Sequence, residues 1–144
     1  MTAKTILLIE DNQSDIDLTK RALRRCRIAN ELVVVDDGKE AIDYLWGAGA
    51  YANRDTAELP TLTLLDLKLP KVSGIEVLRR IREDPRTRRL PVVILTSSNE
   101  EQDIAAGYDL GVNSYIRKPV DSTQFTRAIE QLGLYWLVLN EPPP

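Results

Sequence analysis

Short apolar runs that alternate with stretches of helical periodicity are the feature that most constrains the fold of this chain. A short and nearly continuous apolar run is typical of a strand whose two faces are both buried. Such strands are predicted at residues 5–10, 32–35, 62–66, 91–96 and 114–117. Strands that alternate with helices through short connections form a parallel sheet with helices on both faces. We therefore predict an α/β fold with a doubly wound parallel sheet.

Each predicted strand is followed by a stretch in which apolar residues recur at helical spacing. Helices are predicted over residues 16–26, 41–46, 74–83, 103–110 and, as a long final helix, 125–139. Cys26 lies on the apolar side of the first helix, and we expect it to be an unreactive core residue. Residues 47–55 lack a clear periodicity, which indicates a surface loop or an extension of the second helix.

The length of 144 residues suits a single domain, with a core at about 5–132 and a C-terminal helix and tail at about 122–144. The net charge of −3 provides no basic surplus that would attract nucleic acid or an anionic membrane. No apolar stretch resembles a signal sequence or a membrane span, so we expect a cytoplasmic protein. Histidine is absent, which excludes Ser–His triads and means that any phosphohistidine must lie on another chain.

Charged and hydroxyl side chains occur where the predicted strands end. The first strand ends in Glu10 and Asp11, the third in Asp66, and the fourth in Thr96, while Lys118 follows the fifth. Because ligands of open α/β sheets bind beyond the carboxyl ends of the strands, we expect these groups to converge in one site. Three carboxylates packed together need a cation to offset their repulsion, and carboxylate oxygens suit Mg²⁺.

This combination of residues predicts phosphoryl-transfer chemistry. A carboxylate such as Asp66 can accept a phosphoryl group if the charge of the incoming group is offset. Mg²⁺ can bridge the acceptor and a phosphoryl oxygen, Lys118 can neutralise a second oxygen, and Thr96 can donate a hydrogen bond to a third. We therefore predict Asp66 as the phosphoacceptor.

Four short motifs in this chain resemble those of the receiver domains of two-component response regulators. They are Glu10-Asp11, Leu-Asp-Leu-Lys-Leu-Pro-Lys-Val-Ser-Gly at 65–74, Leu-Thr-Ser at 95–97 and Tyr-Ile-Arg-Lys-Pro at 115–119. The resemblance implies a flavodoxin-like (βα)5 sheet with strand order 2-1-3-4-5. It also implies a signalling protein, not an enzyme, that receives its phosphoryl group from the phosphohistidine of a sensor histidine kinase.

The resemblance further implies a role for each site residue. Asp11 would bind Mg²⁺ directly and Glu10 through water, while Asp66 and the backbone carbonyl of Lys68 would complete the protein ligands. The hydroxyl of Thr96 and the ring of Tyr115 would form a switch pair that moves on phosphorylation.

Lys118 would contact the phosphoryl group, and its bond to Pro119 would be cis. Lys68 and Ser98 occupy positions beside the site that we expect to influence the lifetime of the acyl phosphate.

Three further segments resemble the small single-domain regulators that are paired with bacterial phytochrome kinases. These segments are the insertion between Trp46 and Pro60, residues 85–91, and the aromatic tail at 135–137. The run at 135–139 is almost wholly apolar, and one face against the sheet cannot cover it. We therefore expect a homodimer built on the final helix, with Trp136 and Leu139 in its interface.

Other interpretations of the same residues stay open. The chain could be a receiver-like interaction module that works without phosphorylation, and Asp11 and Tyr115 could be an ordinary helix cap and a core residue. A phosphohydrolase with an aspartate nucleophile would need an acid two residues after Asp66, where Lys68 stands. A nucleotide carrier is disfavoured because no Gly-x-Gly-x-x-Gly motif follows the first strand.

Overall fold

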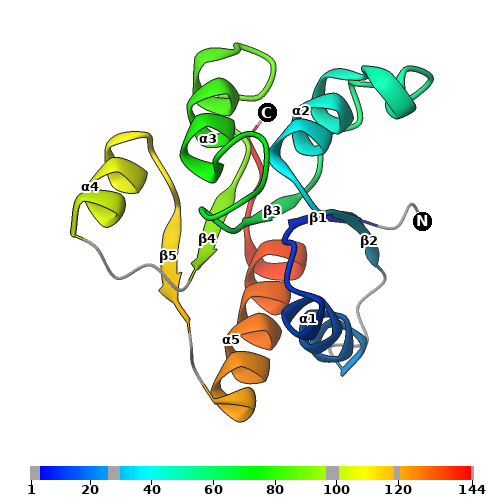
Figure 1. Cartoon of the computed structure of the whole chain (residues 1–144). Coiled ribbons are helices and arrows are strands. Elements are labelled where there is room, and N and C mark those ends of the chain that lie inside the picture. Colours follow the sequence, from blue (N-terminus) through cyan, green and yellow to red (C-terminus); the bar gives the residue numbers. More distant parts are fainter. Residues whose placement is uncertain (1–3, 26–29, 97–100, 119–120, 144) are drawn as a thin grey trace.

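The computed structural model describes residues 4–25, 30–96, 101–118 and 121–143 (Figure 1). Its centre is a five-stranded parallel sheet in the order β2-β1-β3-β4-β5. The strands are β1 (Lys4–Ile9), β2 (Asn30–Val35), β3 (Leu62–Leu65), β4 (Val92–Thr96) and β5 (Ser114–Arg117). The predicted flavodoxin-like α/β fold and its strand order are confirmed.

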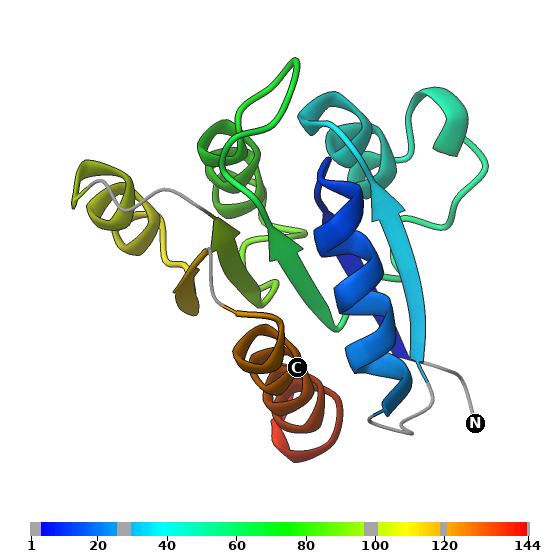
Figure 2. The same ribbon diagram turned by 60° about the horizontal axis from the view of Figure 1, so that its bottom comes forward.

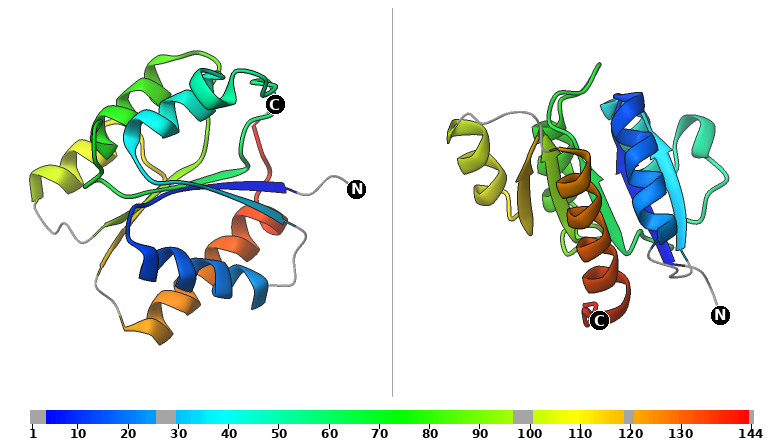
Figure 3. Two further views of the ribbon diagram at one scale, coloured as in Figure 1. Left: turned by 45° about the vertical axis from the view of Figure 1, so that its right-hand side comes forward. Right: turned by 90° about the horizontal axis from the view of Figure 1, so that it is seen from below.

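Helices cover both faces of the sheet. They are α1 (Gln13–Arg25), α2 (Gly38–Trp46), α3 (Gly74–Glu83), α4 (Glu101–Asp109) and α5 (Ser122–Leu134). Figure 2 shows α1 and α5 side by side on one face, and Figure 3 shows α2 and α3 on the other. No helix among the described residues is long and apolar enough to cross a membrane.

The strand β1 explains why the apolar runs are continuous. Successive side chains of a strand point to opposite faces, so a strand between two helical layers needs apolar residues at every position. Ile6 and Leu8 pack with residues of α1 and α5, whereas Leu7 and Ile9 pack with residues of α2 and α3. The apolar cores on the two faces of the sheet therefore both contain side chains of β1.

The insertion after α2 is more ordered than its sequence predicts. It begins at Gly47, which ends α2 with a left-handed φ of 68°, and contains the short 3-10 helix η1 (Gly49–Tyr51). The Tyr51 ring meets the Tyr44 ring edge to face at 5.2 Å, and the Arg54 guanidinium lies 4.2 Å from the centre of the Tyr44 ring. The insertion is thus a packed extension of the α2 layer.

The final helix runs as predicted through two segments. The α-helix α5 passes directly into the π-helical segment η2 (Tyr135–Leu139), which ends at the extended residue Asn140. Phe125, Ile129 and Leu137 are buried in the core that α1 also lines. The long final helix predicted over 125–139 is therefore present, with a change of helical type in its last turn.

Candidate functional site

The acidic residues predicted to converge do so at the carboxyl edge of the sheet. Glu10 and Asp11 follow β1, Asp66 follows β3, and β1 and β3 are neighbours in register. Carboxylate oxygens of the three residues all lie within 4.8 Å of one another. Glu10 and Asp66 are buried, with exposed fractions of 3% and 8%, while Asp11 is exposed.

Lys118 reaches this acidic cluster from the segment after β5. Its ammonium donates hydrogen bonds to Glu10 Oε1 at 2.6 Å and to Asp15 Oδ2 at 2.6 Å, and lies 3.9 Å from Asp66 Oδ2. Sequence reasoning predicted the approach of Lys118 to Asp66 but missed Asp15. No local signal was available, because Asp11 precedes α1 and an acidic residue in the first turn of a helix is ordinary.

Burial and hydrogen bonds together set the pKa values of Glu10 and Lys118. Loss of hydration raises the pKa of the Glu10 carboxyl to about 7, although the hydrogen bond from Lys118 opposes this shift. Burial alone would lower the pKa of the Lys118 amine. Its hydrogen bonds to Asp15 and Glu10 outweigh that effect, and the net pKa of Lys118 is raised. Lys118 therefore stays charged within the site.

The loop from Asp66 to α3 is held by its backbone. The N–H of Lys68 donates to Asp66 Oδ1 at 3.3 Å, and the N–H of Gly74 donates to the Leu67 carbonyl at 2.9 Å. Lys71 adopts a left-handed φ of 67°, and its ammonium lies 3.3 Å from a carboxylate oxygen of Asp37 at the start of α2. The ion pair links this loop to α2, and the Lys68 N–H orients the Asp66 carboxylate.

The predicted switch residues lie on neighbouring strands. Thr96 is fully buried at the end of β4, and Tyr115 is half-buried in β5, opposite Ile94 of β4. The ring of Tyr115 packs against the core on the α3 side of the sheet. Their roles stay predictions. Three further predictions, on Cys26, Ser98 and Pro119, concern residues outside the described part of the chain.

The donor set at this edge fits a hard divalent cation. Glu10, Asp11 and Asp66 supply carboxyl oxygens that lie close together, and oxygen is the ligand that Mg²⁺ and Mn²⁺ prefer. A second acidic group, which includes Asp37 and Glu40, is engaged within the protein. Asp37 accepts from the Glu40 N–H at 2.7 Å, and Glu40 accepts from the Tyr51 hydroxyl at 2.7 Å.

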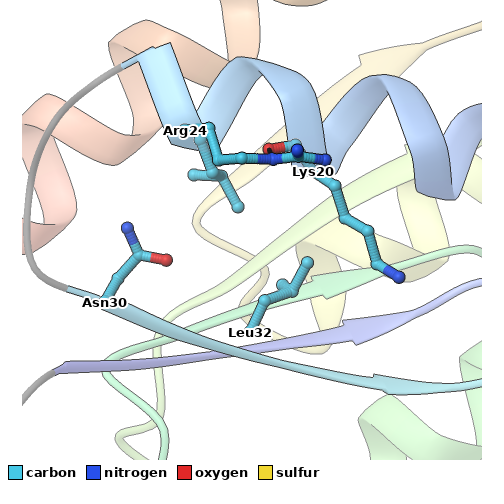
Figure 4. A pocket seen from close by; sticks show the side chains of 5 residues that line it. Lys20, Arg24, Asn30 and Leu32 are labelled. Atoms are coloured by element: carbon cyan, nitrogen blue, oxygen red, sulfur yellow. Dashed lines mark hydrogen bonds between the residues drawn. The ribbon is translucent and has the colours of Figure 1, made fainter.

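A surface depression of about 410 Å³ lies apart from this site, between α1 and β2 (Figure 4). It is lined by Lys20, Leu23, Arg24, Asn30 and Leu32, none of which is acidic. Asn30 and Leu32 belong to the beginning of β2, and thus to the edge of the sheet opposite Asp66. This depression contributes nothing to the acidic site.

The fold and the site together define a class of protein. Residues 6–130 match the response regulator receiver domain family, and the chain belongs to that family. Receiver domains are signalling modules that accept a phosphoryl group from histidine kinases and bind a divalent cation at an acidic pocket.

Particular relatives narrow the class further. The response regulator Rcp1 of Synechocystis is 39% identical, with 93% of this chain and 89% of Rcp1 aligned. The structure of the phosphorylated cyanobacterial phytochrome response regulator RcpA is 43% identical, covers 99% of this chain and 100% of that one, and has a TM-score of 0.91. The Mn²⁺-bound structure of Rcp1 is 38% identical over 98% of this chain and 99% of that one, with a TM-score of 0.90. The predicted resemblance to phytochrome-paired regulators is confirmed.

Proposed function

We propose that this chain accepts a phosphoryl group on Asp66 from the phosphohistidine of a sensor histidine kinase, in a reaction that needs Mg²⁺. The observation that supports this most directly is the placement of Asp66, buried beside Glu10 and 3.9 Å from the Lys118 ammonium. A carboxylate oxygen of Asp66 attacks phosphorus, the phosphorus–nitrogen bond breaks, and the histidine of the kinase leaves with the bonding electrons.

The residues around Asp66 have separate roles in binding Mg²⁺ and in contacting the phosphoryl group. Glu10, Asp11, Asp66 and the backbone carbonyl of Lys68 would hold Mg²⁺, which when bound offsets the charge of the transferring group. The Lys118 ammonium, 3.9 Å from Asp66 Oδ2, is close enough to turn to a phosphoryl oxygen after the transfer. Lys68 stands where a phosphohydrolase needs its general acid, so the acyl phosphate is the product that the site favours.

Incubation with Mg²⁺ and acetyl phosphate, followed by intact-mass measurement, tests the proposal. The wild type should gain one phosphoryl group, and Asp66→Asn should gain none. Asp109→Asn, which changes an exposed aspartate on α4, is the matched control and should be phosphorylated like the wild type. Equal phosphorylation of wild type and Asp66→Asn would remove the central claim, and the absence of phosphorylation in both would favour a module that works without it.

The kinase that we propose is a phytochrome. This assignment is supported by the similarity to the phytochrome response regulator RcpA and to the bacteriophytochrome response regulator RtBRR, whose structure is 51% identical with a TM-score of 0.78. A cytoplasmic location is part of the same proposal. Phosphotransfer from a purified bacterial phytochrome kinase should be faster than transfer from an unrelated histidine kinase, and equal rates would argue against the pairing.

The proposed output is a change in protein contacts. Phosphorylation would draw Thr96 toward the phosphoryl group and turn Tyr115 inward, which alters the surface around α4 and β5. A homodimer through the final helix is the contact that the exposed apolar residues there favour. Leu134, Tyr135, Val138 and Leu139 are exposed by 50%, 48%, 53% and 65%. The downstream protein partner is unidentified.

A further inference from the structure

Lys118 is shared among three carboxylates, and one of them lies outside the acidic cluster of Glu10, Asp11 and Asp66. That carboxylate is Asp15, in the first turn of α1. Its distance from the Lys118 ammonium, 2.6 Å, equals that of Glu10 and is shorter than the 3.9 Å to Asp66. Of the three described carboxylates near the Lys118 ammonium, that of the proposed phosphoacceptor Asp66 is therefore the most distant.

The number of N–H donors on the Lys118 ammonium limits how many of these carboxylates it can bond. An ammonium group has three N–H donors, and two of those on Lys118 are taken by Glu10 and Asp15. A separation of 3.9 Å from Asp66 Oδ2 exceeds the range of a hydrogen bond. Lys118 thus attracts Asp66 through charge while its hydrogen bonds go elsewhere.

Asp15 is held in place by its own helix. Its backbone N–H donates to the side-chain oxygen of Asn12 at 3.0 Å, and its carbonyl accepts from the hydroxyl of the buried Thr19 at 2.7 Å. The first turn of a helix also favours a negative charge. The Asp15 side chain is 23% exposed, whereas that of Glu10 is 4% exposed, so Asp15 forms the outer wall of the Lys118 site.

We propose that Asp15 is a positioning residue that competes with the phosphoryl group for Lys118. This inference rests on the proposed function of Asp66. In the unphosphorylated chain Asp15 holds the ammonium toward α1. When Asp66 is phosphorylated, Lys118 exchanges its bond to Asp15 for one to a phosphoryl oxygen. Asp15 thereby lowers both the rate and the extent of phosphorylation, because the bond between Lys118 and Asp15 must break before Lys118 can bond the phosphoryl oxygen.

The first test measures the rate of phosphorylation by acetyl phosphate in Mg²⁺ for three variants. Asp15→Asn removes the charge and should raise the rate about twofold to fivefold, as expected for the loss of one partly exposed ion pair. Asp15→Glu keeps a carboxylate and should return the rate to near that of the wild type. Asp17→Asn changes an exposed aspartate of the same helix and should have no effect. An unchanged or lower rate in Asp15→Asn would overturn the proposal.

The second test does not depend on phosphorylation. Without a phosphodonor, brief reaction with acetic anhydride and peptide mass analysis measures how freely the Lys118 amine reacts, with exposed Lys20 as the internal reference. Acetylation of Lys118 relative to Lys20 should rise about threefold or more in Asp15→Asn, since the amine loses the charged acceptor that restrains it. Thermal unfolding of each variant checks that the fold is retained.

The two tests separate the failure of this inference from the failure of the proposed function. If the wild type is not phosphorylated on Asp66, the function fails and the acetylation ratio alone decides whether Asp15 restrains Lys118. If the wild type is phosphorylated but Asp15→Asn does not raise the rate, the function stands and the proposed competition is wrong, whatever the acetylation ratio.

Discussion

Gly74 allows the start of α3 to lie directly against the backbone of Asp66, the residue that follows β3. A Cβ atom at this position would lie 2.3 Å from the Asp66 carbonyl oxygen and 2.6 Å from Leu67 Cα. Both are backbone atoms, which cannot turn aside as the end of a side chain can. The glycine of the Leu-Pro-x-x-x-Gly motif is therefore a requirement of packing beside the phosphoacceptor.

Replacing Gly74 by alanine should destabilise the protein and disturb the site. Forced displacement of the backbone at Asp66 should lower the free energy of unfolding by about 2 to 3 kcal/mol and weaken the binding of Mg²⁺. Urea denaturation and titration with Mg²⁺ measure the two effects.

Gly107→Ala is the matched control, because the added Cβ first meets the flexible Cδ1 end of Ile94, at 3.0 Å. Alanine also favours the helical conformation of α4, so the change in stability should stay within about 1 kcal/mol. Similar losses in both variants would show that the backbone of Asp66 is not what excludes a larger residue.

At this scale the sequence predicted the convergence of Glu10, Asp11, Asp66 and Lys118 because each follows a strand of one parallel sheet. It could not predict Asp15. An acidic residue in the first turn of a helix has an ordinary explanation in the helix dipole. Its contact with Lys118, 103 residues away, depends on the path of the chain after β5, which no local pattern encodes.

Among the secondary-structure elements, the insertion after α2 differs most from its prediction. Arg54 explains its order, because one guanidinium donates to the backbone carbonyls of Tyr44, Leu45, Asp55 and Glu58. The strands and helices were predictable from apolar periodicity. This segment was not, since a polar side chain that satisfies several carbonyls leaves no periodic trace in the sequence.

Arg54→Lys should therefore destabilise the protein by about 2 kcal/mol. Lysine keeps the charge but lacks the planar fork of donors, so carbonyls of the insertion and of α2 would lose their partner. Urea denaturation measures the loss. Arg88→Lys changes an exposed arginine after α3 and should be neutral within about 0.5 kcal/mol; equal effects of the two changes would contradict this role of Arg54.

Asp84 links the ends of α2 and α3 and gives the protein an acid-sensitive contact. Its carboxylate accepts hydrogen bonds from Arg86 and from the Trp46 indole at 2.7 Å, and these bonds, with that from the Arg86 backbone, hold the pKa of Asp84 well below its usual range. A depressed pKa in the folded state adds stability above the ordinary aspartate pKa. That stability is lost as the pH falls below about 4.

Asp84→Asn should remove this contribution, so the stability of the variant should fall less steeply than that of the wild type as the pH drops below about 4. Denaturation with urea at a series of pH values measures the two slopes. Asp109→Asn is the control, since Asp109 is exposed on α4. Parallel curves for wild type and Asp84→Asn would show that the contact does not titrate in this range.

On the scale of the whole molecule, the two helical layers are unequal in how they cover apolar surface. The layer of α1 and α5 continues into η2. There Leu137 is buried, but its neighbours Val138 and Leu139 are exposed. Trp136, which the sequence placed in a dimer interface, is half-buried against the core of that layer. Its position makes it a poor probe of association, because a charge there would disturb the fold itself.

The proposed homodimer is better tested at residues whose side chains are exposed. The double variant Leu134→Glu, Leu139→Glu places charges on the apolar surface of α5 and η2, which should be costly only if a second chain covers that surface. By light scattering after size exclusion, we expect the wild type to be a dimer and the variant a monomer. When both proteins are diluted until the wild type is also monomeric, their thermal unfolding should be the same. Tyr108→Glu, at a 53% exposed aromatic residue on α4, is the control and should stay dimeric. If the double variant has the same mass in solution as the wild type, the final helix does not form the interface, and the exposed apolar surface there must serve a different partner.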